Sequence, residues 1–246
     1  MKSVNGISVI TTLFNYANYI EECIDSIIRQ ESPGVPVEHI IIDDCSTDNP
    51  QDNIKKHLHN SSVKYFLLNE NVGYSAAKNC GIKKSKYNTI VMLDADDYLT
   101  DCSLKIRYNK LIDGSFDLVH GPAYVVKNGK KDKISPSMKR WMNNKGSSRR
   151  WKHIHAQGVM LRKEIHSEIG LYDETMRCKS DREMWARIFN RKYKIGTVKN
   201  PVVFYRCHSK QMHRSRWKLK NNKKLTSLME KKIEKRKKSL DGLRML

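Results

Sequence analysis

The sequence predicts an α/β fold in which a mostly parallel sheet is flanked by helices. Short apolar runs rich in β-branched residues alternate with segments of helical periodicity through the first 100 residues, which is the pattern of connected parallel strands. Acidic residues directly follow several of these apolar runs. Loops at the carboxyl ends of parallel strands meet at one edge of a sheet, so we expect a ligand site there.

The first half of the chain supplies the strand and helix units of this prediction. Strands are expected at four short apolar runs, 7–13, 37–42, 63–68 and 89–93. Helices are expected at 19–29 and 75–84, where apolar residues recur at helical spacing. Parallel strands need crossover connections of this kind, so the alternation itself supports the α/β class.

The pattern loosens after residue 100. Further strands are expected at 117–126, 155–161 and 201–205, and a helix at 181–190. Segment 127–152 is basic and rich in Ser and Asn, so we expect a mobile loop. Without a Pro-rich linker or a Gly/Ser tract, the simplest partition is one domain, 1–216, followed by a basic helical tail, 217–246.

Composition narrows the class of protein. Hydrophobic residues make up 39% of the chain, enough for a core, and no apolar run approaches the roughly 20 residues of a membrane-spanning helix. Residues 1–10 are too polar for a secretory signal. The six cysteines lie far apart and form no CxxC pair, which indicates a reduced, cytoplasmic protein.

The net charge of +21 is concentrated in the second half of the chain. Residues 1–126 carry a net −4, whereas 127–163 carry +11 and 217–246 carry +8. This asymmetry predicts an acidic site in the first half and anionic partners for the second.

The basic tail has apolar residues near helical spacing among its lysines: Leu225, Leu228, Met229, Ile233 and Leu240. Two interpretations stay open. The tail is either an interfacial helix on an anionic membrane surface, which would place the protein peripherally at the cytoplasmic face, or a solvated helix that docks its apolar stripe on its own domain.

Asp94, Asp96 and Asp97 directly follow an apolar run. Carboxylates at i and i+2 in a turn suit one hard cation such as Mn²⁺ or Mg²⁺, which leaves positions open for phosphate oxygens. A helix cap or an exposed turn explains many such triplets equally well. Further motifs in the same half favour the cation site.

Thr12, Phe14 and Asn15 follow the first expected strand, and then come DDCSTD at 43–48, NVGYSAAKNCG at 71–81 and DADD at 94–97. In this order the motifs resemble those of the family 2 glycosyltransferases, strongly over 5–100 and weakly over 155–210. The resemblance implies a GT-A fold, a Rossmann-like mixed sheet, with the nucleotide-sugar donor bound by 1–100 and the acceptor by 101–216.

The resemblance also implies roles in donor binding. The donor is usually a UDP-sugar. Phe14 matches the position whose ring packs on the base, Thr12 and Asp44 match positions that meet the uridine, and Asp43 assists. Asp94 and Ala95, which are part of the DxD motif, are implied to contact the donor. An aromatic ring can pack on the face of uracil while a carboxylate accepts a hydrogen bond from its N3–H, so these two residue types together suit uracil recognition. For Phe14, inward packing in the core is the alternative.

A metal ion and a base complete the implied site. Asp94 and Asp96 hold Mn²⁺ or Mg²⁺, and His208, in a late family segment, faces the metal or the diphosphate. Asp181 matches the catalytic base, although Ser180 stands where the family usually has an acidic residue. The alternative is that Ser180 caps a helix and Asp181 occupies its first turn.

Lys78 stands where family members often have Arg. It keeps the positive charge for a phosphate contact but lacks the bidentate fork. Neither GxGxxG nor GxxxxGK[ST] occurs, so the ordinary dinucleotide and P-loop interpretations lose their main support. Trp185 is expected to fill the core rather than stack on a sugar.

The resulting prediction is an inverting, metal-dependent glycosyltransferase that acts on a glycan or a lipid-linked glycan. The basic segments keep an alternative open, a DNA-modifying glycosyltransferase or a non-catalytic nucleic-acid-binding protein. That alternative is not favoured because the chain lacks helix-turn-helix, zinc-finger and RRM signatures.

Overall fold

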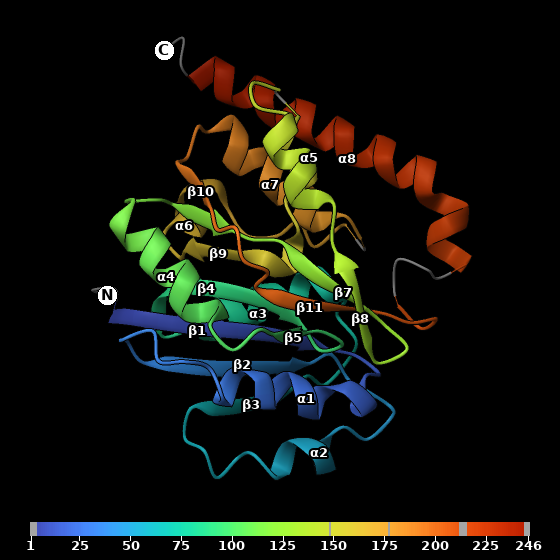
Figure 1. The fold of residues 1–246 in the computed structure, drawn as a ribbon. Coiled ribbons are helices and arrows are strands. Elements are labelled where there is room, and N and C mark those ends of the chain that lie inside the picture. Colours follow the sequence, from blue (N-terminus) through green and yellow to red (C-terminus); the bar gives the residue numbers. More distant parts are fainter. Residues whose placement is uncertain (1–3, 148, 177, 212–215, 244–246) are drawn as a thin grey trace.

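The computed structural model describes residues 4–147, 149–176, 178–211 and 216–243. A seven-stranded sheet of order β10-β6-β9-β4-β1-β2-β3 forms the centre (Figure 1). A four-stranded sheet of order β5-β11-β7-β8 lies beside it, and its β5 is the short strand Tyr98–Leu99. The central strands are β1 (Val4–Leu13), β2 (Val37–Asp43), β3 (Val63–Leu67), β4 (Tyr87–Asp94), β6 (Leu118–His120), β9 (Val159–Arg162) and β10 (Ile195–Thr197).

Most strand pairs of the central sheet are parallel. β1 pairs in parallel with β2 and β4, β2 with β3, and β10 with β6, whereas β9 runs antiparallel to both β4 and β6. The predicted class, a mixed and mostly parallel sheet flanked by helices, is therefore confirmed. The crossover helices are α1 (Ala17–Ile28), α2 (Gln51–Lys55) and α3 (Tyr74–Lys84).

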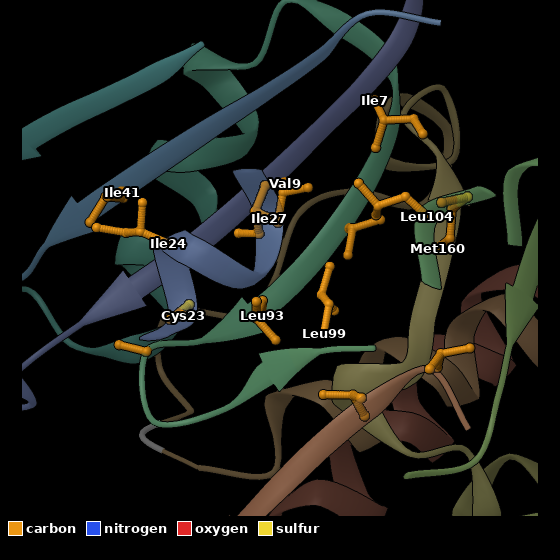
Figure 2. Close-up of a cluster of buried hydrophobic side chains, with 14 of the residues drawn as sticks. Ile7, Val9, Cys23, Ile24, Ile27, Ile41, Leu93, Leu99, Leu104 and Met160 are labelled. Atoms are coloured by element: carbon orange, nitrogen blue, oxygen red, sulfur yellow. The ribbon is translucent and has the colours of Figure 1, made fainter. Parts of the chain in front are cut away.

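Successive residues of the central strands enter two different cores. Ile7 and Val9 of β1 belong to one hydrophobic cluster, and Ile10 belongs to the other. Side chains alternate between the faces of a strand, so a continuous apolar run is what a sheet covered on both faces requires. Figure 2 shows the first cluster, in which Cys23 and Ile24 of α1 pack over the sheet.

The second core lies on the opposite face, beneath α3 and α7 (Ser180–Asn190). Its members include Ala77 of α3 and Met184 of α7. α7 confirms the helix predicted at 181–190. The remaining helices are α4 (Ser103–Asp113), α5 (Ser137–Asn143), α6 (Ile165–Ile169) and α8 (Arg216–Leu243), with 3-10 turns η1 (Arg150–His153) and η2 (Ala156–Gly158).

The single strand predicted at 117–126 is wrong, because the chain forms two strands in different sheets. β6 joins the central sheet, and β7 (Ala123–Lys127) pairs with β8 (Lys130–Ile134) and β11 (Val203–Cys207) in the smaller one. Gly121 and Pro122 separate the two strands. A Cβ on Gly121 would lie 2.8 Å from a Val198 methyl, and Pro122 has no N–H for a ladder.

The mobile loop predicted at 127–152 is also wrong, because this segment contains β8, α5 and the start of η1. Trp141 and Trp151 of this segment are buried, at 2% and 5% exposed, and both pack into the second core. Large aromatic side chains contribute much of the burial that orders such a segment. The strand predicted at 155–161 is shorter than expected, with η2 preceding β9.

α8 packs on α7 (Figure 1). Met229 is 1% exposed, and Ile233 packs against the same core. Lys232 and Arg236 form ion pairs with Asp173 at 2.7 and 3.0 Å. Met229 and Ile233 of the apolar stripe therefore dock on the domain, whereas Leu228 is 40% exposed and the side chain of Leu240 lies outside the described ones. Among the described residues, no helix is long and apolar enough to cross a bilayer.

Candidate active site

A cavity of about 1590 Å³ opens at the carboxyl ends of β1, β2 and β4. Thr12, Asp44 and Asp94 reach it from these strand ends, and Asp181 and Trp185 reach it from α7. Residues from both halves of the chain therefore line one space. Trp185 is 1% exposed and belongs to the second core, as predicted, while it also forms part of the cavity wall.

One end of the cavity carries Phe14, Thr12 and Asp44. Phe14 is 44% exposed, so the alternative in which its ring packs into the core is wrong. The carboxylate of Asp44 accepts hydrogen bonds from the backbone N–H groups of Val72 and Gly73, at 2.7 and 2.9 Å. Burial raises the pKa of Asp44, and these two donors oppose that effect.

Asp43, predicted to assist at the nucleotide, lies outside the cavity lining. It is fully buried, accepts from the Tyr65 hydroxyl at 2.7 Å and accepts from the Ser46 N–H at 2.9 Å. Asp48 accepts from the N–H of Ala17 at 2.9 Å, at the start of α1. Asp43 and Asp48 therefore hold the loop in shape, while Asp44, Thr47 and Asp48 of the DDCSTD motif line the cavity.

Asp94, Asp96 and Asp97 place one carboxylate oxygen each within 4.8 Å of one another. Asp96 and Asp97 are buried and Asp94 is half-buried. Burial, followed by mutual repulsion, raises the pKa of Asp97 well above its usual range, and burial is the main cause of the raised pKa values of Asp94 and Asp96. We call these three residues the carboxylate cluster.

The carboxylate cluster fits a divalent cation. Asp97 Oδ2 is buried and has no hydrogen-bond partner among the described atoms. A hard cation with oxygen ligands would offset the repulsion and occupy that oxygen. Asp97 was not predicted as a ligand, although its place in DADD is a signal that points to it. Ala95 is fully buried and lies outside the lining, so its predicted contact with the donor is not seen.

His208 reaches the carboxylate cluster from the end of β11. Its Nε2 lies 3.0 Å from Asp96 Oδ2, and its ring stacks on Tyr19 with centroids 4.7 Å apart. The structure thus brings His208, predicted to face the metal or the diphosphate, next to Asp96. Arg206 was missed by the sequence analysis. Its N–H donates to Asp97 at 2.9 Å and its guanidinium donates to the Asp96 carbonyl at 2.7 Å.

Gln157 is a second residue that the sequence analysis missed. Its Nε2 donates to Asp94 Oδ2 at 2.5 Å, and its Oε1 accepts from the Asp94 N–H at 2.9 Å. The Tyr74 hydroxyl donates to Asp94 Oδ1 at 2.9 Å. These donors fix the direction of the carboxylate. Gln157 precedes β9, and no motif in its neighbourhood marks it.

Lys78, predicted to contact a phosphate, pairs with Asp181 and lies outside the cavity lining. Its Nζ lies 2.6 Å from Asp181 Oδ1 and 3.9 Å from the centroid of the Tyr74 ring. Lys78 is 1% exposed, and Asp181 faces the cavity. Ser180 is the first residue of α7 and its hydroxyl makes no capping hydrogen bond, so that part of the alternative is wrong, whereas Asp181 does lie in the first turn of α7.

Comparison with known proteins identifies the family. Residues 8–170 match the model of glycosyl transferase family 2. An uncharacterized glycosyltransferase of Rickettsia bellii is 28% identical over 220 residues, which cover 83% of this chain and 30% of that protein. The chain spans between 17% and 60% of the lengths of the first three curated relatives it matches.

Solved structures share the fold. S. aureus TarS 1–349 in complex with UDP-GlcNAc has a TM-score of 0.72 and 19% identity, over 85% of this chain and 60% of that one. The mannosyltransferase PcManGT from Pyrobaculum calidifontis, in complex with GDP-Man and Mn²⁺, has a TM-score of 0.65 and 18% identity, over 87% and 60%. These likenesses support the GT-A fold. Because the family model matches more than half of the residues, the chain belongs to glycosyl transferase family 2.

Proposed function

We propose that the chain transfers a sugar from a UDP-sugar to an acceptor hydroxyl, with inversion at the anomeric carbon. The observation that carries the proposal is that a single cavity joins Phe14 and Asp44, two carboxylates of the carboxylate cluster, and Asp181. A nucleotide site, a cation site and a base are the three parts that this reaction requires.

Phe14 and Asp44 receive the uridine. The exposed ring of Phe14 offers a face for the base, and the Asp44 carboxylate keeps lone pairs for uracil N3–H beside its two backbone donors. The UDP-GlcNAc complex of TarS supports a uridine nucleotide, and the GDP-Man complex of PcManGT shows that the fold also takes a purine. UDP is therefore the first nucleotide to test.

Asp94, Asp96 and Asp97, with His208, would hold Mn²⁺ or Mg²⁺. Such a cation supplies Lewis-acid stabilisation of the charge that develops on the diphosphate. Tyr74, Gln157 and Arg206 keep the carboxylates directed at that place.

Asp181 takes the proton of the acceptor hydroxyl. The hydroxyl oxygen forms a bond to the anomeric carbon, the bond from that carbon to the diphosphate oxygen breaks, and its electron pair leaves on UDP. A single displacement from the opposite face inverts the configuration. Lys78 holds the Asp181 carboxylate in place through a charge-assisted contact of 2.6 Å. The proposed acceptor is a glycan or a lipid-linked glycan.

UDP binding and turnover, measured on wild type, Asp96→Asn and Asp181→Asn, test the proposal. UDP with Mn²⁺ at about 100 times its dissociation constant should stabilise the wild type and Asp181→Asn by roughly 2.7 kcal/mol in thermal unfolding. Asp96→Asn should lose this stabilisation. UDP release from UDP-sugars should fall about 100-fold or more in Asp181→Asn.

Two outcomes would contradict the proposal. If no uridine nucleotide stabilises the wild type, the donor assignment is wrong. If Asp181→Asn turns over like the wild type while binding UDP normally, Asp181 is not the base.

A further inference from the structure

The wall of the cavity beyond Asp181 carries four basic side chains from three elements. Arg140 lies on α5, Lys152 and His153 on η1, and Arg182 on α7, and all four line the cavity. We call these residues the cationic cluster. η1 contacts both α5 and α7, so their side chains gather at one place although they lie up to 42 residues apart in the sequence.

The cationic cluster has little compensating negative charge. Arg140 and Arg182 are exposed and form no ion pair with any described side chain, and Lys152 has a partly exposed partner, Glu230, at 3.5 Å. Burial lowers the pKa of His153, and the charges of Arg140, Arg182 and Lys152 lower it further. Like charges that converge on one point at a cavity wall favour an anionic ligand there.

Among the described residues, hydrogen bonds and ion pairs to the carboxylate cluster come from residues such as Tyr74, Gln157, Arg206 and His208, and no member of the cationic cluster makes one. Contacts run from Asp94 through Tyr74 and Lys78 to Asp181. Arg182 follows Asp181 on α7, so the proposed base is next in sequence to one member of the cationic cluster and is linked through Lys78 and Tyr74 to the carboxylate cluster.

We propose that the acceptor carries a phosphate group, which the cationic cluster holds while Asp181 faces the acceptor hydroxyl. The inference rests on the proposed function and names its substrate class. Two guanidinium groups and an ammonium from three elements suit an oxyanion with oxygens in several directions, whereas one guanidinium fork satisfies a carboxylate. A phosphodiester polymer and a diphosphate-linked lipid glycan share this chemistry.

Binding measurements on Arg140→Gln/Arg182→Gln and on a control test the proposal. The control, Lys130→Gln/Lys199→Gln, also removes two exposed charges, but neither residue lines the cavity. The probes are a soluble glycerol-phosphate oligomer, a farnesyl diphosphate-linked N-acetylglucosamine, a neutral chitotriose and a glucuronate-containing trisaccharide. Each is titrated by calorimetry in the presence of UDP and Mn²⁺.

We expect the wild type to bind one of the two phosphate probes at least tenfold more tightly than the neutral and glucuronate probes. Arg140→Gln/Arg182→Gln should weaken that binding tenfold or more, and the control should stay within twofold. The preferred phosphate probe tells whether the phosphate belongs to a polymer or to a lipid carrier. With that probe as acceptor, the loss should appear in KM, while kcat stays within threefold because Asp181 is retained.

Any of three results would overturn the inference. The wild type could bind the neutral and phosphate probes equally, it could bind the glucuronate probe most tightly, or Arg140→Gln/Arg182→Gln could leave phosphate binding unchanged. The dissociation constant for UDP with Mn²⁺ separates this failure from failure of the proposed function. It should be the same within twofold in wild type and both double variants, which also shows that the variants fold. Loss of UDP binding in the wild type would count against the donor site itself.

Discussion

The ammonium of Lys78 and the carboxylate of Asp181 lie 2.6 Å apart, and this pair connects α3 to α7 beside the cavity. Lys78 is 1% exposed, and the rings of Tyr74 and Tyr172 lie 3.9 and 5.0 Å from its Nζ. A buried ammonium needs a negative partner, so Asp181 and Lys78 hold each other in place. The pair suits Lys78 to a positioning role for the proposed base, and the phosphate contact predicted from the sequence is the alternative.

Lys78→Met is expected to separate these two roles. Since Lys78 lies outside the cavity lining, the dissociation constant for UDP with Mn²⁺ should stay within about twofold of the wild type. Turnover should fall by about 10- to 100-fold, because small misplacements of a reacting group are costly. Calorimetry with UDP and a UDP-release assay give the two values.

Lys78→Arg is the matched control, because it keeps the positive charge. We expect turnover within tenfold of the wild type and unchanged UDP binding. If Lys78→Met weakens UDP binding tenfold or more, the phosphate contact predicted from the sequence is right and the positioning role is wrong.

Phe14→Ala is expected to weaken UDP binding without destabilising the fold. Stacking of a base on an aromatic ring contributes roughly 1 to 3 kcal/mol, so the dissociation constant should rise about 5- to 150-fold. The melting temperature of the free protein should change little, because Phe14 is 44% exposed. Leu67→Ala is the control, since Leu67 is 52% exposed and lies outside the cavity lining. Unchanged UDP affinity in Phe14→Ala would place the base elsewhere.

The sequence predicted the first half well because its signals are local. Strands such as β2 and β4 are short apolar runs, and Asp44 and Asp94 stand where those runs end. The partners of these residues are not local. Lys78 and Asp181 are 103 positions apart, and Gln157 lies 63 positions from Asp94. Spacing rules carry no information about such pairs.

The errors in the second half have the same cause. Segment 127–152 has a composition typical of loops. It is nevertheless ordered, because Trp141 and Trp151 are buried against strands and helices that are distant in the sequence. The break at Gly121 likewise follows from the close approach of Val198 and Val202. Tertiary contacts override local composition at both places.

Met229→Ala is expected to destabilise the protein, because Met229 is 1% exposed at the contact of α8 with the second core. Truncation of a buried Met costs about 2 to 5 kcal/mol of unfolding free energy. The adjacent Leu228 is 40% exposed, so Leu228→Ala should change stability by at most about 0.5 kcal/mol. Urea unfolding of the two variants gives the comparison. Equal, small effects would show that α8 leaves the domain in solution, and would reopen the membrane-surface interpretation.

His39 is expected to make stability depend on pH. It is buried, its Nε2 lies 2.8 Å from Thr11 Oγ1, and burial, aided by the charge of His57, lowers its pKa from 6.5 to about 3. Below about pH 6.5 the unfolded chain binds a proton at this site that the folded protein does not bind. The free energy of unfolding therefore falls as pH drops from about 6.5 toward 3, by up to about 1.4 kcal/mol per pH unit.

His39→Gln keeps a polar side chain beside Thr11 and removes the titration. Its free energy of unfolding, measured in urea from pH 7 to 4.5, should decline less steeply than that of the wild type. Other buried histidines act in both proteins, so the difference between the two slopes isolates His39. His59 is exposed, and His59→Gln should decline in parallel with the wild type. Parallel slopes for His39→Gln and the wild type would mean that His39 is protonated within the fold as readily as in the unfolded chain, contrary to its burial.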